Sequence, residues 1–375
     1  MSWIFIQAED VLFFRDTRSF GKGEDHLAHC IFPPYPITIA GAIRSRIIGD
    51  YSNWDQKLFN DEKIDDLMER IGSPKSLGPK FSIKGPFLAR KVNDNVQCYS
   101  PIPADSFVVD SKKNQFNSFK PKKVSGLVAN WPGDEIFPLW PMNDQRKDAV
   151  EGSFWLSGIA IKLYQTENNF IGEEASKFFS VEKRIGIGKD QLLGTVKSQM
   201  LYTAPFIRIN GNNGLLVWVA DEVKLPQNGM FALGGESRTA YFTTIPDGNI
   251  QQFPEINMEG KNKLKVVLQT PAFLGDGWKP KNGDWSQFGL PKGAKLRAAS
   301  LGRPQMINGW DIARGRQKTL CSYVPIGSVF YFEWDAPLQH SIKTTDICLT
   351  ESPGSIDYKR LGFGQVILSH WNWQE

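Results

Sequence analysis

The sequence predicts an α+β protein built on antiparallel sheets. Strand-like segments outnumber helical ones along the 375 residues, and the few helical segments do not alternate strictly with strands. A doubly wound parallel sheet requires that alternation, so mixed antiparallel sheets are favoured. The length fits two domains. The order of the strands fits a split βαβ, ferredoxin-like unit that is used twice.

The first part of the chain predicts a strand, two helices and an insertion. The segment Trp3 to Ala8 is an apolar, aromatic strand, and a helix capped by its first residue is expected from Thr38 to about Ile48. A shorter amphipathic helix is expected from Asp61 to Ile71. Residues 72–150 are rich in proline, glycine, lysine and asparagine. We therefore expect a long irregular insertion there, with only short strands such as Phe81 to Ile83.

A long hairpin and further strands follow. Phe154 to Tyr164 predicts a strand and then a helix capped by Ser157. Two strand-like pieces separated by glycines and polar residues predict a hairpin over residues 182–202. The other expected strands are Phe206 to Ile209, Leu215 to Val219, Arg238 to Thr243, Leu264 to Leu268, Val329 to Trp334 and Gln365 to His370. We place an N-terminal domain at 1–210, which contains the insertion and the hairpin, and a C-terminal domain at 211–375, which ends in a glycine-rich loop and a strand.

Composition points to a globular intracellular protein. The net charge of +4 permits an acidic partner without demanding one. The four cysteines lie far apart and form no C-x-x-C pair, so neither a zinc site nor a disulfide framework is indicated. The first residues do not read as a signal peptide, and no apolar stretch approaches 18 residues. We expect a soluble, cytoplasmic protein with no membrane partner.

The sequence contains no recognisable set of catalytic residues. His26 and His29 lie three residues apart beside Asp25, but no metal-ligand motif surrounds them, so polar loop histidines are the simpler interpretation. The run Gly186-Ile187-Gly188-Lys189 lacks the spacing and the ending of a phosphate-binding loop. We therefore predict no enzymatic activity, no metal and no cofactor.

Basic residues recur beside glycines and aromatic residues, a pattern that suits single-stranded RNA. The run from Arg360 to Leu368 approaches an RNA-recognition signature, but its basic residue is one place early and Gln365 and Leu368 occupy stacking positions. An ordinary glycine turn, and ion pairs such as Arg184 with Glu182, are the competing interpretations. The predicted RNA-binding residues are Arg15, Arg18, Arg44, Lys183, Arg184, Lys189, Arg238, Arg360, Gly362, Phe363 and Gly364.

Eight segments in order along the chain resemble a known family. They are Phe14-Arg15-Asp16 with Phe20, Phe32-Pro33-Pro34 through Arg44, Glu182 to Ile187 with Leu201-Tyr202, Leu233 to Arg238, Thr270 to Phe273 with Gly277 to Pro280, Gly309-Trp310-Asp311, Pro325 to Val329, and Gly362-Phe363-Gly364. Together they resemble the RAMP superfamily of CRISPR proteins, and more narrowly the third subunit of the Cmr (type III-B) effector complex. Thr17 and Ser19 depart from the pattern, because glycine and proline are common there.

The resemblance implies two ferredoxin-like (RRM-like, βαββαβ) domains with long insertions and a thumb-like hairpin, for which Glu182 to Tyr202 is the candidate. It implies a non-catalytic subunit that binds the 5′ tag of the guide RNA and caps the backbone of the complex. The expected partners are this RNA, the large polymerase/cyclase-type subunit and adjacent RAMP backbone subunits. The alternative is a RAMP endoribonuclease that processes precursor guide RNA with His26 or His29 as general base, assisted by Lys22 or Arg15.

Overall fold

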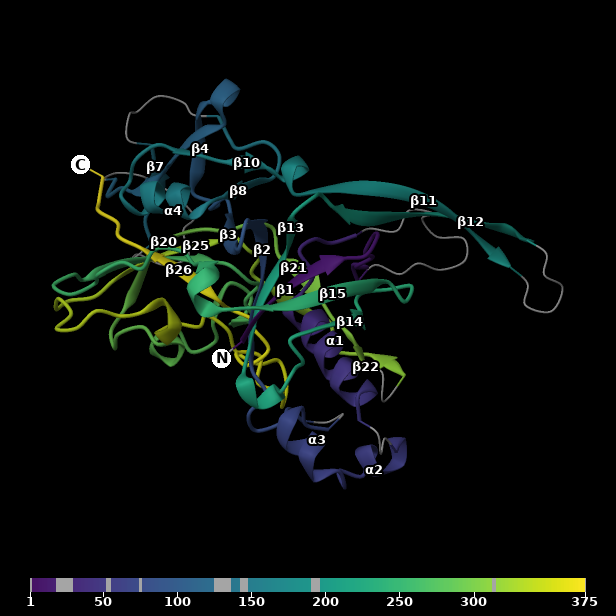
Figure 1. The fold of residues 1–375 in the computed structure, drawn as a ribbon. Coiled ribbons are helices and arrows are strands. Elements are labelled where there is room, and N and C mark those ends of the chain that lie inside the picture. Colours follow the sequence, from purple (N-terminus) through teal and green to yellow (C-terminus); the bar gives the residue numbers. More distant parts are fainter. Residues whose placement is uncertain are drawn as a thin grey trace. The chain divides into compact units, whose positions relative to one another are not determined.

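The computed structural model describes residues 2–17, 30–51, 55–73, 76–124, 136–141, 148–189, 196–311 and 315–374. Strands predominate and helices are few (Figure 1). The chain forms two compact units: the first comprises residues 1–86, 176–247 and 306–321, and the second comprises 87–175, 248–305 and 322–375. Residue 210, the expected domain boundary, lies inside the first unit. A single boundary does not describe the division, because segments of the two units alternate along the chain.

The first unit is organised around β1 (Ser2–Ala8), the predicted first strand. β1 pairs antiparallel with β13 (Asn213–Val219) on one side and with β15 (Thr239–Ile245) on the other. β14 (Asn228–Ala232) pairs antiparallel with β15. Burial of the apolar side chains of β1, such as Ile4, fixes the register, because a shift by one residue would expose them.

α1 (Pro36–Gly49) contacts β14 and confirms the predicted helix, although it begins two residues earlier than Thr38. Pro36 occupies the first turn, where its missing N–H costs no helical hydrogen bond. The side chains of Ile39, Ile43 and Ile47 lie at helical spacing and are buried.

The single helix expected at 61–71 is two short helices, α2 (Gln56–Asn60) and α3 (Asp65–Arg70). The carboxylate of Asp55 caps α2 by accepting a hydrogen bond from the Leu58 N–H at 2.9 Å. Glu62 adopts a positive φ of 59° between the two helices, which ends the helical repeat there.

The predicted hairpin is confirmed and is longer than expected. β11 (Phe179–Lys189) pairs antiparallel with β12 (Val196–Ile209). The 3₁₀ helix η2 (Ala175–Lys177) precedes β11, and η3 (Asp221–Val223) follows β13. Both strands of the hairpin extend from the rest of the first unit in Figure 1.

The second unit contains a four-stranded antiparallel sheet in the order β20-β25-β17-β26. Its strands are β17 (Lys263–Leu268), β20 (Lys295–Ser300), β25 (Val329–Glu333) and β26 (Val366–Ser369). Three were expected from the sequence, and β20 was not. The helical segments that the structure describes between successive strands of this sheet are the 3₁₀ helices η5 (Ser286–Phe288) and η6 (Thr344–Asp346). Both faces of the sheet carry buried clusters of apolar side chains.

The prediction that residues 72–150 hold only short strands is wrong for the described part of this stretch. This stretch contains β2 (Ile83–Val92), β3 (Asn95–Pro101), β4 (Ser106–Asp110) and β5 (Gln115–Ser118). β2 and β3 form an antiparallel hairpin, and β4 pairs with β5. The prolines and glycines that suggested loops stand largely between or at the ends of strands, so composition alone concealed the strands.

α4 (Gly158–Gln165) belongs to the second unit and confirms the predicted Ser157 cap, because the Ser157 hydroxyl accepts a hydrogen bond from the Ala160 N–H at 3.4 Å. It packs beside β26 and β3.

The smaller elements of the chain are η1 (Ser111–Lys113), β6 (Lys120–Pro121), β7 (Leu139–Trp140), β8 (Phe154–Leu156), β9 (Phe170–Ile171), β10 (Glu173–Glu174), η4 (Asp247–Asn249), β16 (Ile250–Gln251), β18 (Gly275–Asp276), β19 (Lys279–Pro280), β21 (Gln305–Ile307), β22 (Trp310–Asp311), β23 (Arg316–Gln317) and β24 (Cys321–Tyr323). No described helix has the length and apolar character needed to cross a membrane.

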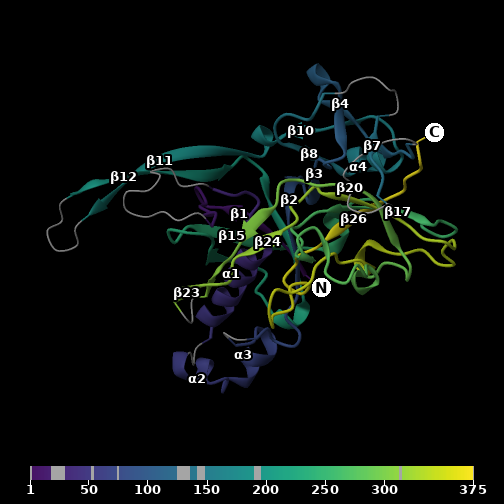
Figure 2. The ribbon, with the colours of Figure 1, turned by 180° about the vertical axis from the view of Figure 1, so that it is seen from behind.

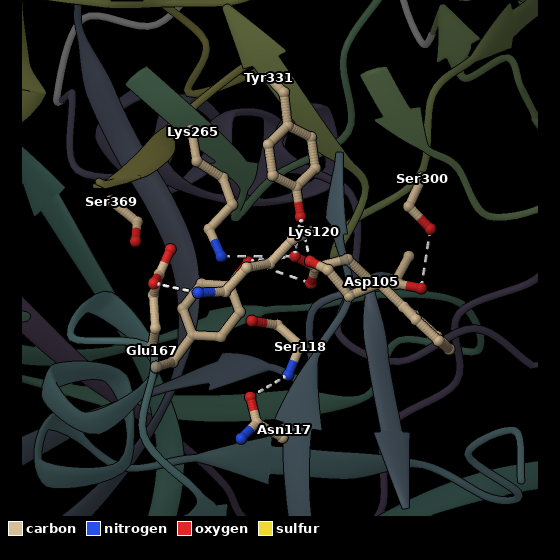
Figure 3. A network of polar contacts seen from close by, with 12 residues as sticks. Asp105, Asn117, Ser118, Lys120, Glu167, Lys265, Ser300, Tyr331 and Ser369 are labelled. Carbon is tan, nitrogen blue, oxygen red and sulfur yellow. Dashed lines mark hydrogen bonds and ion pairs between the residues drawn. The ribbon is translucent and has the colours of Figure 1, made fainter. Parts of the chain in front are cut away.

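A buried polar cluster lies in the core of the second unit (Figure 3). Asp105, from the turn between β3 and β4, accepts hydrogen bonds from the hydroxyls of Tyr164 and Tyr331. The Lys265 ammonium lies 3.4 Å from the same carboxylate. Burial lowers the pKa of Lys265, and the charge of Asp105 opposes that shift. Burial, followed by the charge of Asp105, raises the pKa of both tyrosines well above the usual value.

Candidate nucleic-acid interface

The two faces of β11 differ in character. Val181, Lys183 and Ile185 alternate along the strand and are exposed, with 56% of Val181 and 71% of Ile185 accessible to solvent. Glu182 and Arg184 point to the opposite face and are half-buried. Lys183 makes no ion pair with any described residue. One face of the hairpin therefore presents a cation between two large apolar side chains.

The other face of the hairpin packs on the loop that follows β1. The side chains of Val11 and Phe13 form a buried cluster with Ala204 and Phe206 of β12. The rings of Phe13 and Phe206 lie 5.0 Å apart between centroids. The backbones of Leu12 and Ile207 also form a β-bridge. These contacts hold the base of the hairpin against the first unit.

Two arginines and two carboxylates form a closed ion-pair cluster at that base. Arg184 donates from Nε to Glu182 at 2.7 Å and from Nη2 to Asp10 at 3.0 Å. Arg208 donates from Nε to Glu182 at 2.8 Å and from Nη2 to Asp10 at 2.9 Å. The hydrogen bond from Arg184 is the main cause that lowers the pKa of each carboxyl. The cluster is neutral overall, so it holds the hairpin in place rather than presenting a free positive charge.

Arg238 supplies a cation near the same aromatic ring. Its Cζ atom lies 4.7 Å from the centroid of the Phe206 ring, a cation–π arrangement. Its Nε atom is buried without a hydrogen-bond partner, and no described carboxylate lies within salt-bridge distance of it. Gly234, with a φ of +84°, lies so close to Phe13 that a Cβ there would be 2.4 Å from the Phe13 carbonyl oxygen. The glycine turn thereby ties the start of the Arg238 segment to the hairpin base.

The remaining basic residues that the sequence suggested belong to separate elements of the chain. Arg15 is exposed and lies in a β-bridge with Cys30. Arg44 donates from Nη2 to the Ser73 carbonyl at 2.6 Å, a contact that secures α1. Arg360 is half-buried in the turn before β26. Arg18 and the side chain of Lys189 lie outside the described residues.

The Gly362-Phe363-Gly364 turn does not have the geometry proposed for RNA contact. Phe363 is 0% exposed, and its ring packs 4.8 Å from that of Tyr358, so neither face is open to a base. The Gly362 N–H donates to the Lys359 carbonyl at 3.2 Å, and the Gly364 N–H donates to the Pro271 carbonyl at 2.9 Å. Both donors are thus used inside the fold, and the turn opens the last strand, as the competing interpretation held.

Sequence reasoning missed three residues of the hairpin base: Asp10, Phe206 and Arg208. Their roles depend on the register in which Glu182 lies opposite Phe206, and that register is not readable from the sequence. His26, His29 and Lys22, the candidates for ribonuclease chemistry, lie outside the described residues. Across the described part of the chain, no group of three or more His, Cys, Asp or Glu side chains is placed to hold a metal ion.

The sequence profile of the family described as CRISPR-associated protein (Cas_Cmr3) matches residues 4–371. No curated protein sequence matches significantly. A chain in a cryo-EM structure of the Type III-B Cmr-beta bound to cognate target RNA and AMPPnP (state 1) is similar at 14% identity and a TM-score of 0.48, covering 88% of this chain and 86% of that one. A second cryo-EM structure, of the Type III-B Cmr-beta bound to cognate target RNA, gives the same identity and coverage with a TM-score of 0.46.

A chain in a crystal structure of the Csm3-Csm4 subcomplex of the type III-A CRISPR-Cas interference complex is similar at 11% identity and a TM-score of 0.38. That match covers 99% of this chain and 100% of the other. The profile match extends over nearly the whole sequence, from within β1 to two residues beyond β26. The chain therefore belongs to the CRISPR-associated Cas_Cmr3 family.

Proposed function

We propose that this protein is a non-catalytic subunit of a type III-B CRISPR effector complex and that it binds the 5′ tag of the guide RNA. Its membership of the Cas_Cmr3 family supports the assignment to a type III effector. The observation that carries the RNA-binding role is the exposed face of β11, where Lys183 stands between Val181 and Ile185. A cation flanked by two apolar side chains suits single-stranded RNA, in which phosphates alternate with bases.

In this proposal Lys183 contacts a phosphate, and Val181 and Ile185 lie against or between unstacked bases. Arg238, held on the ring of Phe206, provides a second cation at the base of the hairpin. Arg184 acts indirectly, because its charge is balanced by Glu182 and Asp10. Each phosphate contact to a single strand contributes roughly −0.7 to the slope of log affinity against log salt.

The proposal extends to the partners and to the origin of the fold. We place the chain beside the large polymerase/cyclase-type subunit and the adjacent RAMP backbone subunits, in the cytoplasm. The strand order of the four-stranded sheet, in which the first strand lies between the third and the fourth, supports derivation of the second unit from a ferredoxin-like βαββαβ unit whose helices are replaced by 3₁₀ turns and loops. We propose a ferredoxin-like origin for the first unit as well.

Binding of labelled guide RNA with an intact or scrambled 5′ tag tests this role. Fluorescence anisotropy would compare the large subunit alone with the large subunit co-purified with this protein. We expect a preference for the intact tag only when this protein is present, and a weaker preference in Lys183→Ala and Arg238→Ala. Lys162→Ala is the matched control, because Lys162 is exposed on α4. Equal affinity for both RNAs in every sample would contradict the proposal.

A further inference from the structure

The outer edge of β14 is open to pairing with another strand. β14 is the last strand in the order β13-β1-β15-β14, and no described strand pairs with its other side. The Thr244 N–H donates to the Gln227 carbonyl at 2.7 Å, so these two residues form a hydrogen-bonded pair. Such pairs alternate along an antiparallel ladder, so the backbone N–H and C=O groups of Asn228, Met230 and Ala232 point away from β15.

This edge lacks the features that usually prevent a further strand from pairing. Edge strands of natural proteins carry charged side chains, prolines or bulges, which block the addition of another strand. Residues 225–235 include no charged side chain, β14 contains no proline, and its register with β15 is uninterrupted. An edge of this kind is typical of a site at which a partner protein adds a strand.

One face of the sheet beside this edge is covered, and the other face presents apolar side chains. α1 contacts β14 and lies beside β15 in the views from both sides (Figures 1 and 2). A Cβ on Gly229 would lie 2.9 Å from the Phe242 ring and 3.6 Å from Nε of Arg46 in α1, so α1 covers this face. On the opposite face Met230 and Tyr241 are partners in the register, with 47% and 42% of their surfaces accessible. A strand added to β14 would place its own side chains against Met230.

The charge of the open face is negative. No lysine or arginine occurs in β1, β14 or β15. Glu9 follows β1 and Glu236 follows β14, and no described cation lies within salt-bridge distance of either carboxylate. The Tyr241 hydroxyl hydrogen-bonds to Glu9, which places this carboxylate on the open face with Met230. Such a surface repels the phosphates of RNA and attracts lysine and arginine side chains.

We propose that β14 accepts an added strand from a partner protein, in the form of an extended segment that carries lysine or arginine beside apolar residues. Main-chain hydrogen bonds to Asn228, Met230 and Ala232 supply the affinity. Glu9 and Glu236 select a basic segment over an acidic one. The hairpin proposed to bind RNA is a separate element, so the two proposals succeed or fail independently.

The test uses the full-length chain and a fluorescein-labelled peptide of about eight residues, the length of an ordinary strand, in which lysine and valine alternate. Fluorescence anisotropy should show saturable binding, and the same peptide with glutamate in place of lysine should bind at least about tenfold more weakly. Met230→Pro removes an outward N–H but no hydrogen bond to β15, whereas Met230→Ala keeps that N–H. Met230→Pro should therefore bind the peptide roughly 2- to 10-fold more weakly than Met230→Ala, as for the loss of one hydrogen bond.

Hydrogen exchange locates the contact. The outward amides of residues 228–232 should exchange rapidly in the chain alone and become protected when the lysine–valine peptide binds. Thermal unfolding verifies that each variant retains its fold. Met230→Lys is a second variant, because its side chain lies on the open face, and its charge should weaken binding of the basic peptide. Met230→Pro should leave tag-dependent binding of guide RNA unchanged, which separates this proposal from the one made for the hairpin.

Equal affinity of Met230→Pro and Met230→Ala for the lysine–valine peptide would overturn the proposal. Equal binding of the glutamate peptide, unchanged exchange at residues 228–232, or displacement of the peptide by oligouridine would do the same. A dimer of the chain alone, detected by light scattering and abolished by Met230→Pro, would also contradict it, because the occupant of the edge would then be a second copy.

Discussion

The ammonium of Lys265 lies 3.8 Å from the centroid of the Tyr164 ring, while the hydroxyl of the same tyrosine donates to Asp105, the counter-ion of that lysine. Lys265 on β17 also lies opposite Tyr331 on β25. One carboxylate thus joins α4, two strands of the sheet and the turn before β4. The stretch that the sequence suggested to be a loose insertion is tied into the core by this carboxylate.

Replacing Lys265 should destabilise the protein strongly. Lys265→Met leaves the buried Asp105 without a cation, and loss of one partner of a buried pair costs about 3–5 kcal/mol. Asp105→Asn introduced together with Lys265→Met should recover most of that loss, because no uncompensated charge remains. Urea unfolding followed by circular dichroism measures both effects. Lys63→Met is the control, since Lys63 pairs with Asp61 on the surface at 3.5 Å, and it should cost less than about 1 kcal/mol. A similar small cost for Lys265→Met would show that the buried pair contributes little.

Alkaline pH should also weaken the core. The raised pKa values of Tyr164 and Tyr331 mean that the folded protein retains two protons that the unfolded chain releases near pH 10. Stability from these groups is complete below about pH 10 and is lost as the pH rises further. The lowered pKa of Lys265 acts in the opposite direction, but only below about pH 10.4, where the unfolded lysine is still protonated.

Above about pH 10 the free energy of unfolding should fall less steeply in Tyr331→Phe than in the unmodified protein. The difference is up to about 1.4 kcal/mol per pH unit, because the variant lacks one of the two retained protons. Absorbance of phenolate, recorded during pH titration, should show at least two of the nine tyrosines, Tyr164 and Tyr331, ionising only as the protein unfolds. Burial also raises the pKa of Tyr35 and of Tyr99 to about 12, so these two should ionise later than the remaining tyrosines. Nine tyrosines that titrate together in the folded protein would contradict the arrangement.

Two neighbouring cations of the hairpin should behave differently toward RNA. Lys183 is exposed and makes no ion pair in the described part of the chain, so Lys183→Ala should reduce the magnitude of the salt slope of binding by about 0.7. Arg184 is neutralised by Glu182 and Asp10, so Arg184→Ala should leave the slope unchanged. Anisotropy titrations at several salt concentrations provide both slopes. Equal reductions in the two variants would mean that the ion-pair cluster opens to bind phosphate.

The turn before β26 should prove structural. Gly364 has a φ of +67°, and a Cβ there would lie 2.7 Å from the Leu349 carbonyl carbon. We expect Gly364→Ala to destabilise the protein by about 1–3 kcal/mol, while the RNA affinity of the folded fraction stays the same. Gly354→Ala is the matched control, because a Cβ at that position meets no atom within 4 Å. Thermal denaturation together with RNA titration separates the two effects, and a selective loss of RNA binding would restore the turn as a binding site.

The elements that periodicity predicts are those whose apolar faces are continuous in sequence. β1, α1, the Ser157 cap of α4, the hairpin and most of the four-stranded sheet were predictable for this reason. β2 to β5 were not, because prolines and glycines within and between them, such as Gly85 and Pro86 inside β2, suggested loops. The division into two units could not be predicted from the sequence either, because each unit is built from three segments that are far apart along the chain.

For the candidate site, the sequence indicated residue types but not their environments. Basic residues beside a hairpin could be recognised from Lys183 and Arg184, but their different environments depend on which face of β11 each occupies. Asp10 helps to neutralise Arg184 from a position far away in sequence, and Arg208 binds the same two carboxylates. Phe363 looked like a stacking residue because its neighbours are glycines, yet those glycines serve a buried turn. Sequence spacing identifies residue types, whereas exposure and charge balance require the fold.

Photocrosslinking of the assembled complex tests the central claim most directly. Guide RNA carrying 4-thiouridine within the 5′ tag would be irradiated, and the crosslinked peptides would be identified by mass spectrometry. The account predicts crosslinks from tag nucleotides to the exposed face of β11, at Val181 to Ile185, which are lost when the tag sequence is moved to the 3′ end. Crosslinks from the tag to other subunits alone, with none to this hairpin, would contradict it.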